Sequence, residues 1–75
     1  MTPNADVHAA PLLTITEAAL VLRVGRTLAY EMARQYIASA GRYGLPVIRL
    51  GRGCLRVPRW ALDELVHTGR VVQLS

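Results

Sequence analysis

The side chains best suited to chemistry in this 75-residue chain are its nine arginines, since the chain contains no lysine. Eight of them lie within residues 23–59, where Glu31 is the one acid, so this region carries a net charge of +7. Residues 1–22 carry −2 and residues 60–75 carry −1. A guanidinium group presents a planar fork of donors that pairs with phosphate or with the edge of guanine. The polarised charge predicts a protein that binds a polyanion, and the alternative is a solvated basic surface.

Residues of the kinds used in catalysis or metal binding are few and scattered. His8, Cys54 and His67 lie far apart in the chain and lack the spacing of zinc ligands. We find no paired carboxylates, no Ser/His/Asp or Cys/His arrangement and no phosphate-binding glycine loop. The sequence therefore predicts a protein that is not an enzyme, with no metal and no cofactor.

The size and composition predict one folded domain in a reducing compartment. A chain of 75 residues has room for a single core, and 52% hydrophobic residues with a mean hydropathy of +0.26 favour a folded state. The single cysteine, Cys54, excludes an internal disulfide. No apolar run approaches the roughly 18 residues of a membrane span, and no signal peptide is recognisable. We expect a cytoplasmic protein without membrane contact, with a flexible arm at residues 1–11, a domain at 12–68 and a short tail at 69–75.

The elements of the expected domain begin with two helices. Thr14 and Glu17 have the spacing of a capping box, which predicts a helix over residues 15–23 with Leu12 or Leu13 packed against it. Gly25 can cap a second helix over residues 26–39. Its expected core face is Ala29, Met32, Ala33, Tyr36 and Ile37, and its outer stripe is Arg26, Thr27, Tyr30 and Arg34. Two helices joined by a tight glycine-containing turn are typical of a helix-turn-helix.

A hairpin and a third helix are expected to complete the domain. Residues 46–50 and 54–57 alternate as two strands, with Arg52 between two glycines at the tip. The expected inward side chains are Ile48, Leu50, Leu55 and Val57, and the expected outward ones are Arg49 and Arg56. Pro58 can occupy the first turn of a helix over residues 59–67 that Gly69 ends. This helix is expected to bury Trp60, Leu62, Leu65 and Val66.

In this order of motifs, the chain resembles the excisionase and AlpA-like group of small winged-helix proteins, relatives of the MerR DNA-binding domain. The resemblance covers roughly residues 12–68. It is carried by Leu13–Ala19, Leu22–Thr27, Tyr30, Leu45–Arg52, Leu55–Arg59 and Ala61–Leu62. It implies a mostly α-helical winged helix-turn-helix of three helices and a two-stranded wing. The chain departs from the group's pattern at Gly25, at Glu31 and in a longer segment between residues 30 and 46.

The resemblance also implies which residues contact DNA. Arg26, Thr27 and Tyr30 match the start of a recognition helix that enters the major groove, and Arg34 matches a basic position further along it. The wing positions are Arg49, Arg52 and Arg56, near a minor groove or the phosphate backbone. Tyr36 and Trp60 are expected in the core.

The function that follows is that of an excisionase, a recombination directionality factor of a phage or mobile element. Such a protein binds double-stranded attachment-site DNA beside neighbouring copies of itself, bends the DNA and directs a tyrosine or serine integrase toward excision. The dimerising helix and effector domain of MerR regulators are not recognisable after the winged helix, which favours this reading. Two alternatives stay open: a small AlpA- or MerR-like transcription regulator, and a protein-interaction module such as an anti-repressor that uses the tail and the loop around Tyr43.

Overall fold

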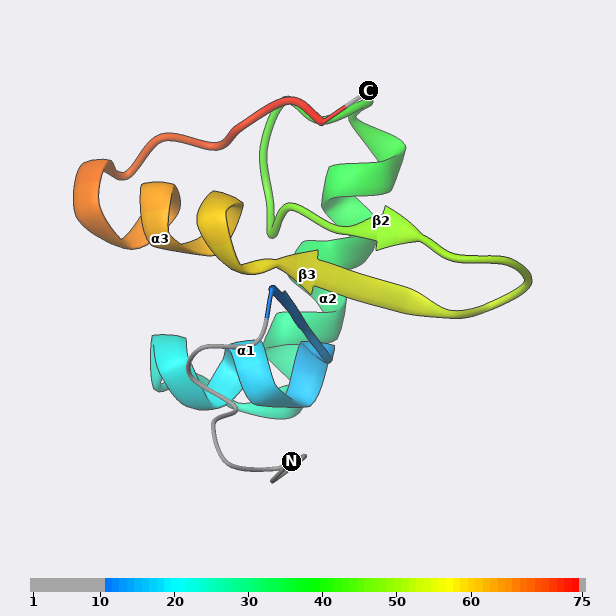
Figure 1. Ribbon diagram of the computed structural model, residues 1–75, viewed down its shortest axis with the longest axis horizontal. Helices are drawn as coiled ribbons and strands as arrows, with labels where there is room; N and C mark the ends of the chain where they lie inside the picture. Colours follow the sequence, from blue (N-terminus) through cyan, green and yellow to red (C-terminus); the bar gives the residue numbers. More distant parts are fainter. Residues whose placement is uncertain (1–10, 75) are drawn as a thin grey trace.

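The computed structural model describes residues 11–74 and contains three helices and a three-stranded antiparallel sheet in that part of the chain (Figure 1). The elements, in chain order, are β1 (Leu12–Leu13), α1 (Ile15–Leu22), α2 (Arg26–Ala38), β2 (Ile48–Arg49), β3 (Leu55–Pro58) and α3 (Arg59–Thr68). Each helix lies within one residue of its predicted bounds. The first strand of the hairpin is shorter than predicted, and the second has the predicted length but begins one residue later. Of the predicted arm only Pro11 lies within the described residues.

Local capping interactions determine where α1 begins and ends. The hydroxyl of Thr14 accepts a hydrogen bond from the backbone N–H of Glu17 at 3.0 Å, and the Glu17 carboxylate accepts one from the Thr14 N–H at 2.8 Å. This is the predicted capping box. Arg23 adopts a left-handed conformation with φ 60°, which ends the helix one residue before the predicted boundary. Gly25 then caps α2 as predicted, without a side-chain hydrogen bond.

The sheet has one strand more than the predicted two-stranded wing. Its strand order is β1–β3–β2, with Leu13 opposite Val57 and Ile48 opposite Arg56. The additional strand, β1, consists of Leu12 and Leu13, for which packing against α1 was the prediction. Two residues are too short to show the alternation that identifies a strand. Their pairing is set by the distant partner β3, and Arg59 N–H donates to Pro11 C=O at 2.8 Å just beyond the strand.

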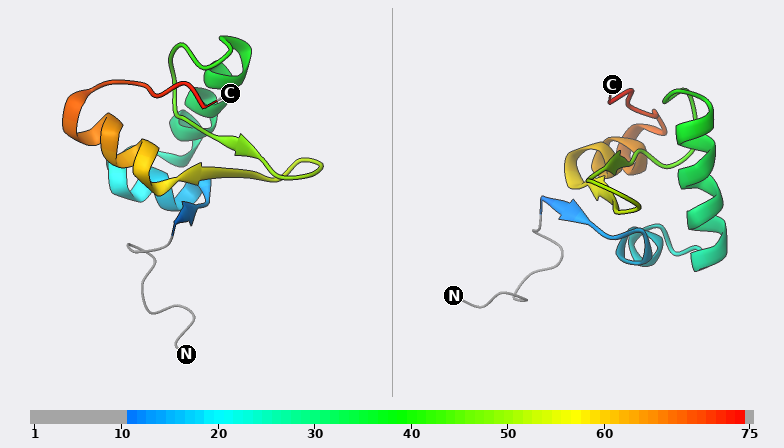
Figure 2. Two further views of the ribbon diagram at one scale, coloured as in Figure 1. Left: turned by 45° about the horizontal axis from the view of Figure 1, so that its top comes forward. Right: turned by 90° about the vertical axis from the view of Figure 1, so that its right-hand side faces the viewer.

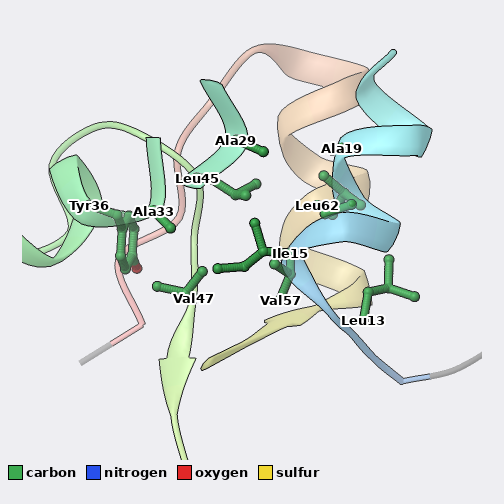
Figure 3. Close-up of a cluster of buried hydrophobic side chains, with 11 residues drawn as sticks. Leu13, Ile15, Ala19, Ala29, Ala33, Tyr36, Leu45, Val47, Val57 and Leu62 are labelled. Atoms are coloured by element: carbon green, nitrogen blue, oxygen red, sulfur yellow. The ribbon is translucent and has the colours of Figure 1, made fainter. Parts of the chain in front are cut away.

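The core lies between α1 and α2 on one side and the sheet and α3 on the other (Figure 3). Its buried members are Leu13, Ile15, Ala18, Ala19, Ala29, Ala33, Tyr36, Leu45, Val47, Val57 and Leu62. Alanines on the facing sides of α1 and α2 allow the two helices to approach closely. Tyr36 is 5% exposed, as predicted for a core residue. No polar or charged side chain is buried among the described residues apart from this tyrosine.

Four side chains predicted to face the core are exposed: Trp60, Val66, Leu50 and Ile37. In α3 the buried stripe runs through Ala61 and Leu62, and at about 100° per residue Trp60 falls on the opposite side of the helix. Trp60 is therefore 60% exposed, and its prediction as core is wrong. Leu50 directly follows β2 on the way to the hairpin tip, and it is 43% exposed.

The segment between α2 and β2 is held by a close approach to α2. The Leu45 N–H donates to the Met32 carbonyl at 3.0 Å, and the Leu45 side chain is fully buried. Gly44, with φ 101°, passes so near that a Cβ there would collide with the Met32 carbonyl oxygen. Glycine is required at this position both by its backbone conformation and by space.

Residues 70–74 return across the molecule to the end of α2 (Figure 1). The Tyr36 hydroxyl donates to the Val72 carbonyl at 2.6 Å and accepts from the Leu74 N–H at 2.8 Å. The Gln73 side-chain amide donates to the Ala40 carbonyl at 3.0 Å. Val71 and Leu74 pack against the core cluster. This part of the predicted tail is thus attached to α2 by its backbone as well as by its side chains.

Candidate nucleic-acid interface

The first half of α2 presents the predicted polar stripe to solvent. Arg26, Thr27, Tyr30 and Arg34 are all exposed, and Tyr30 is 40% exposed. The backbone N–H groups of the first turn have no side-chain cap from Gly25, and no acidic residue lies in that turn. The start of α2 therefore combines free backbone donors with a guanidinium group and a hydroxyl, a set that suits phosphate and base edges.

The hairpin of β2 and β3 presents the other three predicted residues. It extends well beyond the body of the protein (Figures 1 and 2). Arg52 is exposed at its tip between Gly51 and Gly53, which have φ 67° and 72°. Arg49 is also exposed, whereas Arg56 is half-buried and donates from Nη1 to the Leu55 carbonyl at 2.8 Å. That contact holds the Arg56 guanidinium beside the base of the hairpin.

A groove of about 420 Å³ joins α2, the hairpin and the start of α1. Its lining residues are Thr14, Ile15, Thr16, Tyr30, Gly53, Cys54, Leu55 and Arg56. Of the seven predicted contact residues, the groove brings Tyr30 and Arg56 together. Figure 1 shows that α1 begins on the same side of the molecule from which the hairpin projects. Thr16 also lines the groove but was not predicted as a contact residue, because no local pattern of residues links it to the distant hairpin.

Arg49 lies apart from this groove. It lines a second hollow with Tyr36, Ile37, Ala40, Gly41 and Val47, near the end of α2. The predicted contact residues of the hairpin therefore divide between two places: Arg56 faces the groove, and Arg49 lies toward the far end of α2. Arg52 belongs to neither hollow and stands alone at the tip.

Few of the arginines are neutralised within the protein. In residues 11–74 the one ion pair is between Arg59 Nε and Asp63 Oδ1, at 3.2 Å. Arg59 is the first residue of α3, and this pair joins it to a side chain one turn further along the same helix. The remaining seven arginines of residues 23–59 form no ion pair in the described part of the chain, so their charge is available to an external anion. The Glu17 carboxylate is directed at the Thr14 N–H.

Comparison with known proteins identifies no relative. No family model, no curated protein and no solved structure matches this chain. Among the described residues no group of histidine, cysteine, aspartate and glutamate could hold a metal ion. None of the three described helices is long and apolar enough to cross a membrane. The resemblance to the excisionase and AlpA-like group therefore stays a prediction from the sequence.

Proposed function

We propose that this protein is a DNA-binding accessory factor of the excisionase type, built as a winged helix-turn-helix. The observation that carries the proposal is the arrangement of arginines without carboxylate partners around α2 and the β2–β3 hairpin, which adjoin a common groove. A helix and a projecting hairpin that both carry arginines suit double-stranded DNA as the polyanion. Its phosphates give a large, sequence-independent share of the binding free energy.

In this proposal α2 enters the major groove with its first turn toward the base edges. A major groove about 12 Å wide admits one helix. Arg26 and Thr27 are placed to contact bases, with Tyr30 and Arg34 further along the same exposed stripe. The hairpin then lies over the sugar-phosphate backbone or the next minor groove, where Arg52 at the tip and Arg49 behind it add positive charge.

Excision further requires that the DNA be bent so that integrase-bound sites meet. Bending a short site costs on the order of 1–6 kcal/mol, which a domain with few base contacts does not recover alone. Several copies on adjacent sites therefore share the cost, and a tyrosine or serine integrase is the expected protein partner. The expected location is the cytoplasm of the bacterial host.

A gel-shift titration with circularly permuted probes tests this function. On attachment-site DNA of the element that encodes the protein, we expect a ladder of cooperative complexes with bent DNA. Binding confined to a promoter fragment, with one or two complexes, would instead identify a transcription regulator that uses the same surface. Absence of binding to either DNA at low salt would refute DNA binding and favour a protein-interaction module, for which Tyr43 is exposed on the loop after α2.

A further inference from the structure

The groove between α1, α2 and the hairpin is lined by apolar side chains together with hydrogen-bond donors, and its lining includes no carboxylate. Four side chains of the lining carry hydroxyl or guanidinium groups: Thr14, Thr16, Tyr30 and Arg56. The Thr14 hydroxyl already accepts from the Glu17 N–H, which leaves Thr16, Tyr30 and Arg56 as the candidate ligand contacts. Tyr30 and Thr16 form no side-chain hydrogen bond within residues 11–74, and Arg56 uses one nitrogen on the Leu55 carbonyl. The other nitrogens of Arg56 are therefore available, and its Nη1 contact holds the group in place.

The backbone at this groove adds donors of the same kind. The first helical residues Ile15 and Thr16 line it, and their N–H groups precede the first intrahelical hydrogen bond, which Ala18 N–H makes to Thr14 C=O. The Glu17 N–H is taken by the Thr14 hydroxyl. The Glu17 carboxylate lies outside the groove lining and is bound to the N–H of Thr14. A donor set with one positive charge matches a singly charged oxyanion with several acceptor oxygens.

We propose that this groove seats one phosphate diester of the DNA backbone. The inference rests on the proposed DNA-binding function and deepens it. With α2 in the major groove and the hairpin over the adjacent minor groove, the strand that separates the two grooves passes between them, over the space that Thr16, Tyr30 and Arg56 line. The contact sets how deeply α2 enters the DNA and carries no sequence information.

The test uses duplex DNA of arbitrary sequence at low salt, because phosphate contacts do not depend on sequence. The variants are Thr16→Val, Tyr30→Phe and Arg56→Gln. Matched controls are Tyr43→Phe and Arg42→Gln, which alter an exposed tyrosine and an exposed arginine of the loop after α2. Thermal unfolding of each variant verifies that it folds. Thr16→Ser, which retains the hydroxyl, is the rescue variant.

We expect Arg56→Gln to weaken binding about tenfold and to reduce the slope of log K against log salt by about 0.9, the value for one phosphate. Thr16→Val and Tyr30→Phe should each weaken binding about threefold or more without changing the slope. Thr16→Ser keeps the hydroxyl and should therefore bind DNA with the wild-type affinity. Of the two control variants, Tyr43→Phe should bind DNA with the wild-type affinity, and Arg42→Gln should bind within about twofold of it.

Cys54 supplies a second readout, because it is half-buried and lines the same groove. Duplex DNA should slow alkylation of its thiol by iodoacetamide in the wild-type protein and much less in Arg56→Gln at equal occupancy. Inorganic phosphate at millimolar concentration should give no comparable protection, since the proposed occupant is held there by the rest of the duplex.

The outcomes separate this inference from the function on which it rests. One outcome would overturn the proposed phosphate contact and leave DNA binding intact. In that outcome the wild type binds DNA in a salt-dependent way, all three variants bind within twofold of their controls, and DNA does not protect Cys54. Protection by inorganic phosphate without any binding of duplex DNA would make the groove a small-anion site and would overturn both. A wild-type protein that binds neither duplex DNA nor inorganic phosphate would also refute both the phosphate contact and the DNA-binding function.

Discussion

Replacing Tyr36 with phenylalanine removes a single oxygen that joins α2 to the C-terminal segment. The hydroxyl donates to the Val72 carbonyl at 2.6 Å and accepts from the Leu74 N–H at 2.8 Å, so two hydrogen bonds are lost together. The ring itself is 5% exposed and keeps its packing in the variant. The change therefore isolates the polar contacts from the hydrophobic ones.

The expected loss of stability follows from those two hydrogen bonds. Each has a net value of about 1 kcal/mol. Val72 and Leu74 are partly exposed, so water can reach the groups left without a partner and the full desolvation cost does not apply. The free energy of unfolding should fall by about 2 kcal/mol, which lowers the Tm of a domain this size by on the order of 10 °C.

Urea denaturation followed by circular dichroism measures the change, with Tyr43→Phe as the matched control. Tyr43 is 57% exposed, and its hydroxyl forms no hydrogen bond within the described residues, so its loss should change stability by less than about 0.5 kcal/mol. Hydrogen exchange of the Leu74 amide should become faster in Tyr36→Phe. If Tyr36→Phe were as stable as Tyr43→Phe and Leu74 kept its protection, the segment would not be attached through this hydroxyl.

Three further predictions concern the backbone, the core and the DNA-binding surface. Gly44→Ala should destabilise the protein by about 3 kcal/mol in urea denaturation, because φ is 101° and the new Cβ would collide with a backbone carbonyl. Leu62→Ala should lower the free energy of unfolding by about 2–5 kcal/mol, because this side chain is fully buried. Trp60→Ala should lower it by less than about 1 kcal/mol, because that side chain is 60% exposed. The reverse order would show that the buried face of α3 is wrongly assigned. Arg52→Ala should weaken binding to all DNA sequences and reduce the slope of log K against log salt by about 1. Arg26→Ala should reduce the binding free energy by about 1–3 kcal/mol and relax the sequence preference. Gel shifts on matched and mismatched sites distinguish the two effects.

Interactions between near neighbours in the chain were predictable from the residues alone. The capping box of Thr14 and Glu17 joins residues three apart, and the N-cap of α2 at Gly25 follows from the same local rules. The exposed stripe that begins at Arg26 follows from the spacing of residues on a helix. In each case the geometry is set within one or two turns, so the residue types determine it.

Features that join distant parts of the chain were not predictable in this way. The strand β1 exists because Leu12 and Leu13 meet β3 more than forty residues later in the chain, and a two-residue segment has no periodicity of its own. Trp60 was assigned to the core because it begins an apolar run, but the position of α3 against β3 buries Leu62 and leaves Trp60 in solvent. Apolarity alone does not determine which side of a helix meets the rest of the protein.

The sequence by itself determined the helices, the N-caps of α1 and α2 and the concentration of arginine in residues 23–59, since these depend on local geometry and composition. Only the tertiary structure decided that Thr16, Tyr30 and Arg56 line one groove, and that the Tyr36 hydroxyl attaches the C-terminal segment. These groups come from separate elements, and the Tyr36 contact to Val72 spans 36 residues. Their proximity follows from how the elements pack around the core, a property of the whole chain that no local pattern of residues contains.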